Sequence, residues 1–179
     1  MMNSPPPKRV APMPGVLPLT PEKEANQRAA VVRESLKWLN TPYHQQADII
    51  GAGVDCSMLL VRAWVDAGII EPFDPRPYPP NWHMHQSEER YLGWMETLAV
   101  ETETPQVADI RLMTFGRCYS HSGILVSPTS MVHAHQRVGM CCLSDFHESW
   151  LVYFDTKGTR LRPTKYFDIW ARLREYENV

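Results

Sequence analysis

The first half of the chain carries hydrophobic residues at helical spacing in three segments. Residues 21–40 form the first segment, with Thr20 in position to cap a helix whose first residue is a proline. Residues 56–67 form the second, and Gly68 would end it. The third begins at Ser87, in the stretch SEERYLGWMETLAV. The pattern therefore predicts three helices in the first hundred residues.

The second half of the chain has a different texture, with short alternating or apolar stretches separated by turn residues. Such stretches predict β-strands. They cover residues 108–115, 121–127, 130–136, 137–143, 149–154 and 166–174. Helices followed by a run of strands are typical of an α+β fold, in which N-terminal helices pack on an antiparallel sheet. A parallel, doubly wound sheet would instead alternate helices with strands.

Prolines separate the N-terminal segment from the rest of the chain. Residues 1–21 hold seven of the 16 prolines, which excludes a long helix or a central strand there. We expect residues 1–21 to be an extended arm and residues 22–179 to form one domain. Because a proline-rich segment loses little entropy on ordering, it can dock along another protein subunit. The alternative is that it folds back over its own domain and covers the cleft.

Composition narrows the classes of partner. The chain has 179 residues, of which 44% are hydrophobic, and its formal net charge is −2. Without a basic surface, nucleic acid is not an expected partner. No apolar run is long enough to span a membrane, and the N-terminal stretch MMNSPPPKRVAPMPG lacks the apolar core of a secretion signal. The four cysteines are therefore expected to be reduced thiols.

Cys56 is the candidate nucleophile. It stands between Asp55 and Ser57 at the predicted start of the second helix, where the helix N-terminus would lower the pKa of the thiol. Such a thiol needs a base within hydrogen-bond reach and a third group that orients the base. The predicted strands offer three histidines for these roles: His121, His133 and His135. A buried core cysteine is the alternative interpretation.

The predicted hairpin that carries these histidines determines which of them lie opposite each other. A three-residue loop at 127–129 would pair the residues on either side of it and place His133 opposite Gly123, diagonal to His121. His135 would then lie directly across from His121. Since Gly123 has no side chain, it leaves room for an imidazole. His133 is the preferred third member, and His135 is its rival.

The ordered set TPY…VDCS…HSGILV…MVHAH resembles the NlpC/P60 family of papain-like cysteine peptidases. That family carries TPY, then DCSG, then a strand beginning HxGIY, then a histidine twelve residues after the first. His133 lies at this distance from His121. The resemblance covers roughly residues 28–175. It implies a papain-like fold and a cysteine endopeptidase that needs no cofactor or metal.

The resemblance also implies roles for single residues. Cys56 would be the nucleophile, His121 the base, and His133 the group that orients His121. Tyr43 would assist the Cys56 backbone amide in an oxyanion hole. The residues expected to line the site and bind substrate are Asp55 and Ser57. Members of the family commonly cut the stem peptides of peptidoglycan, so a peptidoglycan peptide is the expected substrate.

The stretch PYPPNWHMHQSEERYL is similar to proline- and tryptophan-containing insertions of the phage-tail members of this family. This likeness implies a protein of the virion, made in the host cytoplasm and acting in the periplasm or cell wall. Its partners would be other tail proteins, bound through residues 1–21. The alternative is a structural protein of the tail tip with a weak or silent site, since Met58 stands where the family has glycine.

Zinc binding is the alternative use of the same side chains. Cys118-x-x-His121 and His133-x-His135 have the spacing of zinc ligands, and Cys141 is near them in sequence. A zinc site would need neither Tyr43 nor Cys56. A second His-x-His pair, His83 and His85, is expected to lie in a loop.

Overall fold

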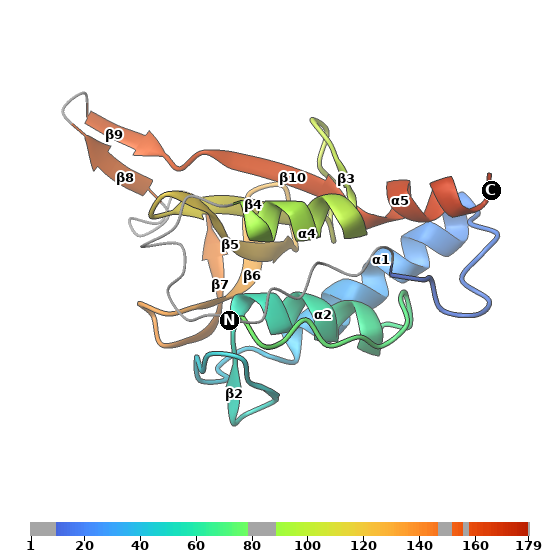
Figure 1. Ribbon diagram of the computed structural model, residues 1–179, viewed down its shortest axis with the longest axis horizontal. Coiled ribbons are helices and arrows are strands. Elements are labelled where there is room, and N and C mark those ends of the chain that lie inside the picture. The colour runs from blue at the N-terminus through green and yellow to red at the C-terminus, as the bar shows by residue number, and fades with distance from the viewer. Residues whose placement is uncertain (1–9, 79–88, 147–151, 156–157, 179) are drawn as a thin grey trace.

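The computed structural model describes residues 10–78, 89–146, 152–155 and 158–178, with the backbone alone at 152–155 and 158–161. Helices lie against one side of an antiparallel sheet, and a hairpin projects at one end (Figure 1). The α+β class with N-terminal helices on an antiparallel sheet is confirmed. The helices are α1 Pro21–Leu36, α2 Cys56–Asp66, α4 Arg90–Leu98 and α5 Ile169–Tyr176. The strands are β1 Asp48–Ile49, β2 Gly53–Val54, β3 Val100–Glu101, β4 Ile110–Phe115, β5 Cys118–Leu125, β6 Ser130–His135, β7 Met140–Asp145, β8 Val152–Asp155, β9 Gly158–Leu161 and β10 Thr164–Asp168.

In the described part of the chain, six strands form the main sheet in the order β3-β10-β4-β5-β6-β7. Every neighbouring pair runs antiparallel. The last strand of the sequence, β10, enters between β3 and β4, so the C-terminal segment closes the sheet that the middle of the chain builds. Two further pairs, β1-β2 and β8-β9, are separate two-stranded sheets.

Short polar side chains begin three of the helices. Thr20 Oγ1 accepts a hydrogen bond from the Lys23 amide at the start of α1, as the sequence predicts. Asp55 caps α2 by accepting from the Met58 amide at 2.9 Å. Asp168 caps α5 in the same way. These caps satisfy amides that have no partner inside their own helix.

The helical side of the sheet holds the main hydrophobic core. Ile110, Leu112 and Ile124 from the sheet pack there with Leu60 and Trp64 of α2. Other apolar side chains of α1, α4 and α5 complete this cluster. The opposite face carries a smaller cluster of buried methionine and leucine with partly buried aromatics: Met113, Leu125, Met131, Phe115, Phe146 and Tyr166. Alternation along β5 thus sends successive side chains to two different environments.

Arg28 joins the two halves of the fold. From α1 its guanidinium binds Asp109 at 2.6 Å, just before β4, and Asp168 at 3.0 Å, at the cap of α5. It also donates to Glu24 and stacks over Trp170 at 4.1 Å. Because Arg28 is buried, its charge depends on these partners, which fix α1 against the sheet.

Residues 10–20 lie against their own domain. Pro12 bridges with Ile70, and the Tyr176 hydroxyl donates to the Val10 carbonyl. Val10 and Val16 are buried in the main core cluster. These contacts agree with the alternative in which the arm folds back. They lie away from Cys56, whereas residues 1–9 are outside the described part.

Two boundaries differ from the sequence-based prediction. Residues 166–174 were expected to be a strand, but β10 ends at Asp168 and α5 follows, because Asp168 caps a segment that buries its apolar residues at helical spacing. The first helix ends at Leu36 and continues as turns to Asn40, whose φ is +66°. The expected start of the third helix at Ser87 and the first residues of the predicted strand 149–154 lie outside the described residues.

Candidate active site

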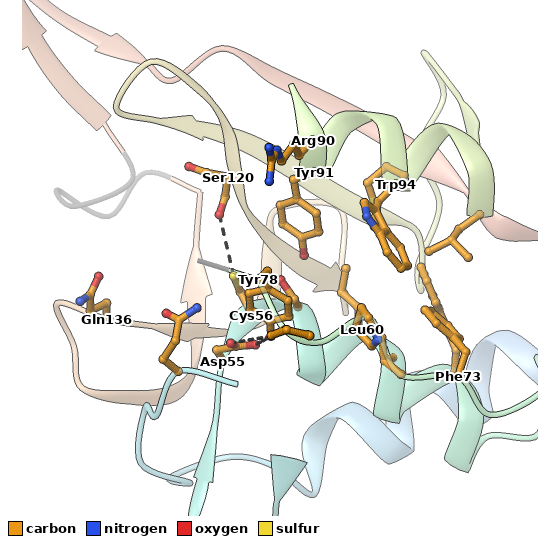
Figure 2. Close-up of a pocket in the computed structure, with 18 of the residues that line it drawn as sticks. Asp55, Cys56, Leu60, Phe73, Tyr78, Arg90, Tyr91, Trp94, Ser120 and Gln136 are labelled. Atoms are coloured by element: carbon orange, nitrogen blue, oxygen red, sulfur yellow. Dashed lines mark hydrogen bonds between the residues drawn. The ribbon is translucent and has the colours of Figure 1, made fainter. Parts of the chain in front are cut away.

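Cys56 is the first residue of α2, as predicted. Its Sγ lies 3.9 Å from the backbone carbonyl oxygen of Ser120, the residue before His121 on β5 (Figure 2). Among the described residues, no hydrogen bond joins the sulfur to an imidazole. The structure therefore brings the thiol to the strand that carries His121, with the sulfur against the strand backbone.

The sulfur meets β5 beyond the end of the β5-β6 ladder. The β5-β6 ladder consists of two pairs, Ile124 with Val132 and Leu125 with Met131. On the side of Ile124 that leads back to Ser120, no further ladder pair joins the two strands in the described residues. β5 continues to pair with β4 on its other side, while β6 continues to pair with β7. Within the described part of the chain, β5 thus makes no ladder pair with β6 from residue 123 down to 120, and the start of α2 approaches β5 at Ser120.

His121 and His133 form a hydrogen-bonded pair. The distance between His121 Nε2 and His133 Nδ1 is 2.7 Å, and both rings are buried. The predicted register is confirmed, since Ile124–Val132 and Leu125–Met131 are the pairs that a 127–129 loop requires. A Cβ on Gly123 would lie 3.0 Å from His133 Cβ, so the glycine does make room for this ring.

By alternation along β5, His121 points to the same face as Leu125, while Ile124 points toward α2. The histidines therefore occupy the face of the sheet opposite the main core. Phe115 covers them, with its ring centroid 5.1 Å from that of His121 and 5.5 Å from that of His135. This placement explains why the Cys56 sulfur meets the backbone near His121.

Cys142 is a residue of this cluster that the sequence analysis did not identify. Its Sγ lies 3.5 Å from His133 Nε2, on the side of the ring away from His121. β6 pairs His133 with Cys142 across the β7 hairpin. The sequence feature that could have revealed this pairing is Gly139, which ends the four-residue loop 136–139 between β6 and β7 and has a φ of +81°. Because the two strands were predicted as contiguous, their register could not be assigned.

His135 lies close to the pair without entering its hydrogen bond. The ring centroids of His121 and His135 are 5.0 Å apart and their planes nearly perpendicular, at 88°. His133 thus makes the contact to His121 that a third triad member needs.

Asp55 is buried and holds the local structure of the site in place by hydrogen bonds. Its carboxylate accepts hydrogen bonds from the amides of Met58 and Gln46 and from the Tyr78 hydroxyl at 2.7 Å. It is 1% exposed. Ser57 and Tyr43 line the same pocket as Cys56. Asp55 therefore fixes the loop before α2 and the segment at Tyr78.

Burial controls the charges of the site. It raises the pKa of the Cys56 thiol from 9.0 to about 12, and the negative charge of Asp55 acts in the same direction. The Ser122 amide and the Ser57 hydroxyl favour the thiolate more weakly. The backbone amide of Cys56 at the helix N-terminus acts in the expected direction, but burial outweighs it and the net pKa is raised.

Burial also lowers the pKa of the three imidazoles. The pKa of His121 falls well below 6.5, and repulsion between the rings adds to this effect. The pKa of His133 falls to about 3 and that of His135 to about 4. In the free protein near neutral pH the thiol and the imidazoles are therefore uncharged.

A cavity of about 140 Å³ opens beside Cys56. Its polar residues gather at the Cys56 end, where Asp55 lies, and aromatic side chains form the other end (Figure 2). There the rings of Phe73 and Trp94 stack at 5.8 Å. His121 is not part of the lining in the described residues.

Solved structures show which fold this is. The chain is similar to the peptidoglycan hydrolase RipB of Mycobacterium tuberculosis, with a TM-score of 0.55 and 14% sequence identity over 94% of this chain and 74% of that one. It is also similar to the NlpC/p60 domain of the peptidoglycan hydrolase SagA, with a TM-score of 0.52 and 15% identity over 77% and 96%. This is the NlpC/P60 fold.

A third similar structure is NlpC1 of Trichomonas vaginalis, with a TM-score of 0.53 and 15% identity over 80% of this chain and 43% of that one. No protein-family model and no curated protein sequence matches the chain. The likeness to NlpC/P60 domains is therefore one of fold, at low sequence identity.

In this NlpC/P60 fold, the departure at Met58 is accommodated in the core. Met58 is 2% exposed and packs with Trp38 and Val54 in a cluster behind α2. It does not line the Cys56 cavity. The methionine thus leaves the pocket open.

The alternative zinc ligands are divided between two environments. Cys141 packs with Val132 and Ala134 on the helical side of the sheet, whereas His133 faces the other side. Within the described residues, no group of three or more His, Cys, Asp or Glu side chains could hold a metal ion. His83 and His85 lie outside those residues. None of the described helices is long and apolar enough to cross a membrane.

Proposed function

We propose that this protein is a cysteine peptidase that hydrolyses peptidoglycan peptides, with Cys56 as nucleophile, His121 as base and His133 as the residue that orients His121. One observation carries the proposal. Cys56 begins α2 with its sulfur against the β5 backbone beside His121, whose imidazole is hydrogen-bonded to His133. The NlpC/P60 fold, which two peptidoglycan hydrolases share, supports the choice of substrate.

The first step transfers a proton. His121 uses Nε2 for its bond to His133, so Nδ1 is the atom left to take the thiol proton. The sulfur then attacks the peptide carbonyl carbon, and His121 returns the proton to the leaving amine as the C–N bond breaks. Water hydrolyses the resulting thioester and restores the thiol. Because thiol and imidazole start uncharged, proton transfer accompanies attack on bound substrate.

This step requires one of the two tautomers that the contact between His133 and Cys142 allows. When His133 Nε2–H donates to Cys142 Sγ, His133 Nδ1 can only accept, and His121 must donate from Nε2. The lone pair of His121 then lies on Nδ1. Cys142 therefore acts as a positioning residue through His133.

Two donors stabilise the oxyanion. The Cys56 backbone amide at the first turn of α2 has no partner within its helix. Tyr43 lines the pocket beside it. Burial and the neighbouring negative groups raise the pKa of Tyr43, so its hydroxyl stays protonated. In the structure it donates to Gln45 Oε1 at 3.3 Å, and the oxyanion would replace that acceptor.

We further propose that the protein acts as part of a phage tail, made in the host cytoplasm and delivered to the periplasm or cell wall with the virion. The support is the insertion PYPPNWHMHQSEERYL in the sequence. The other tail proteins would be bound through the proline-rich residues 1–21. Immunogold labelling of purified virions would test it, and a protein absent from the tail would contradict it.

The test of the enzymatic proposal is digestion of purified peptidoglycan, with the soluble fragments identified by mass spectrometry. The wild-type protein should release peptide fragments, and Cys56→Ala should lower the rate by at least about 10³-fold. Cys141→Ala is the matched control, because it removes a buried sulfur that packs with Met58 and Leu59 and does not line the Cys56 cavity. Equal loss in both variants would contradict the assigned nucleophile.

The second candidate is a structural tail protein with a silent site. The raised pKa of Cys56 favours it, since a thiol that stays protonated is a weak nucleophile. Peptidoglycan that remains intact with wild-type protein, in a digest where a known hydrolase succeeds, would support this candidate.

A further inference from the structure

The cavity beside Cys56 follows one face of α2. Cys56, Leu60 and Trp64 are spaced four residues apart and all line it. Eight residues of helix span about 12 Å, so the lining runs from the sulfur to an indole ring well away from it. Phe73 and Trp94 form the opposite wall at the apolar end (Figure 2).

Trp64 supplies a second, independent observation. Its side chain is fully buried, and its indole Nε1–H has no hydrogen-bond partner among the described residues. A buried donor without a partner carries a desolvation cost that a ligand acceptor would remove. Trp64 therefore brings an unused donor next to the cavity that it lines.

The general acid decides which part of a substrate enters the cavity. His121 must reach the leaving group to protonate it, yet His121 does not line the cavity within the described residues. The leaving group therefore lies on the other side of the sulfur. The group attached to the attacked carbonyl, on the acyl side, is the one directed along α2.

We propose that this cavity is the acyl-side specificity pocket, and that it takes an apolar group with a hydrogen-bond acceptor near its far end. The inference rests on the proposed nucleophile and narrows its substrates to acyl compounds and peptides with an apolar residue before the cleaved bond. A cavity of about 150 Å³ holds a benzene ring, so this one, at about 140 Å³, takes a group of that size. Arg90 also lines the cavity, so the apolar assignment rests on the aromatic end, where Phe73 and Trp94 stack.

Nitrophenyl esters with one leaving group and different acyl groups test the pocket. The thiolate attacks the ester carbonyl, nitrophenolate leaves with the bonding electron pair, and water hydrolyses the thioester to the free acid. From acetyl to hexanoyl, kcat/KM should rise about fourfold for each methylene. A flat series overturns the pocket assignment.

Two variants of α2 locate the effect. Leu60→Phe adds volume inside the cavity and should remove the gain beyond butanoyl. Leu59→Phe makes the same kind of change at the neighbouring position, which packs in a different cluster, and should keep the full series. Circular dichroism confirms that both variants are folded. Equal series in the two variants would place acyl recognition elsewhere.

A binding experiment gives a readout that does not depend on turnover. Hexanamide is titrated into Cys56→Ala protein while the indole N–H resonances are followed by nitrogen-15 NMR, with Trp64→Phe to assign the signal. The Trp64 resonance should shift saturably, and that of Trp38, buried in a different cluster, should not. An unmoved Trp64 resonance overturns the assignment.

The outcomes separate this inference from the proposed function. A steep acyl series with intact peptidoglycan would remove the proposed substrate and keep the pocket. Cleaved peptidoglycan with a flat series and an unmoved Trp64 resonance would remove the pocket and keep the peptidase.

Discussion

The ionisation of Cys56 can be tested directly by alkylation. Burial raises its pKa from 9.0 to about 12, a change of three powers of ten in the thiolate population at any pH below 9. At pH 8 an ordinary thiol is ionised at about one site in ten, and Cys56 at about one in 10⁴. A thiolate of higher pKa is intrinsically more nucleophilic, which raises its alkylation rate by about 20-fold and offsets part of this loss. The net expectation is alkylation about 50-fold slower than that of a free thiol.

The assay is iodoacetamide labelling of the native protein at a series of pH values, quenched and read by mass spectrometry of the Cys56 peptide. Glutathione in the same tube is the reference. Restricted access would lower the rate equally at each pH, whereas the raised pKa makes the rate climb about tenfold per unit up to pH 10. A plateau between pH 6 and 8.5, with a rate above that of glutathione, would show a thiolate–imidazolium pair and refute the argument.

Two further predictions concern the support of the site. Gly123→Ala should destabilise the fold by about 1–3 kcal/mol in urea unfolding, because the added methyl would lie 3.0 Å from His133 Cβ; unchanged stability would show that β5 and β6 can part freely. Arg28→Met should cost about 3–5 kcal/mol, since it leaves the buried carboxylate of Asp109 without its cation and Asp168 with Arg174 alone. Arg28→Lys should fall between wild type and Arg28→Met, and a stable Arg28→Met protein would show that the carboxylates find other partners.

Much of the fold could be predicted because local chemistry determines it. Thr20 before Pro21 fixed the start of α1, and the loop at 127–129 fixed the register that brings His133 to His121. The end of the chain could not be predicted in the same way. Residues 166–174 alternate like a strand, yet Asp168 caps a helix at a point where the alternation alone gives no sign of change.

The relation between Cys56 and His121 depends on events that are distant in sequence. It requires that the pairing of β5 with β6 stop at Ile124 and not extend back to Ser120, so that the start of α2 can reach the β5 backbone there. Strand alternation predicts which face a histidine occupies, but it does not predict where two paired strands part.

For the pKa of Cys56, the sequence and the structure give opposite predictions. A helix N-terminus stabilises an anion by about 0.3–1 kcal/mol, and this effect is visible in the sequence. Removing a charge from water costs several kcal/mol even after the protein relaxes, and only the packing of the chain shows how complete that removal is. Burial is therefore the larger effect, and the cap Asp55, which starts the helix, adds its own negative charge beside the thiol. A catalytic Cys56 must consequently obtain its thiolate by passing the proton to His121 as substrate binds.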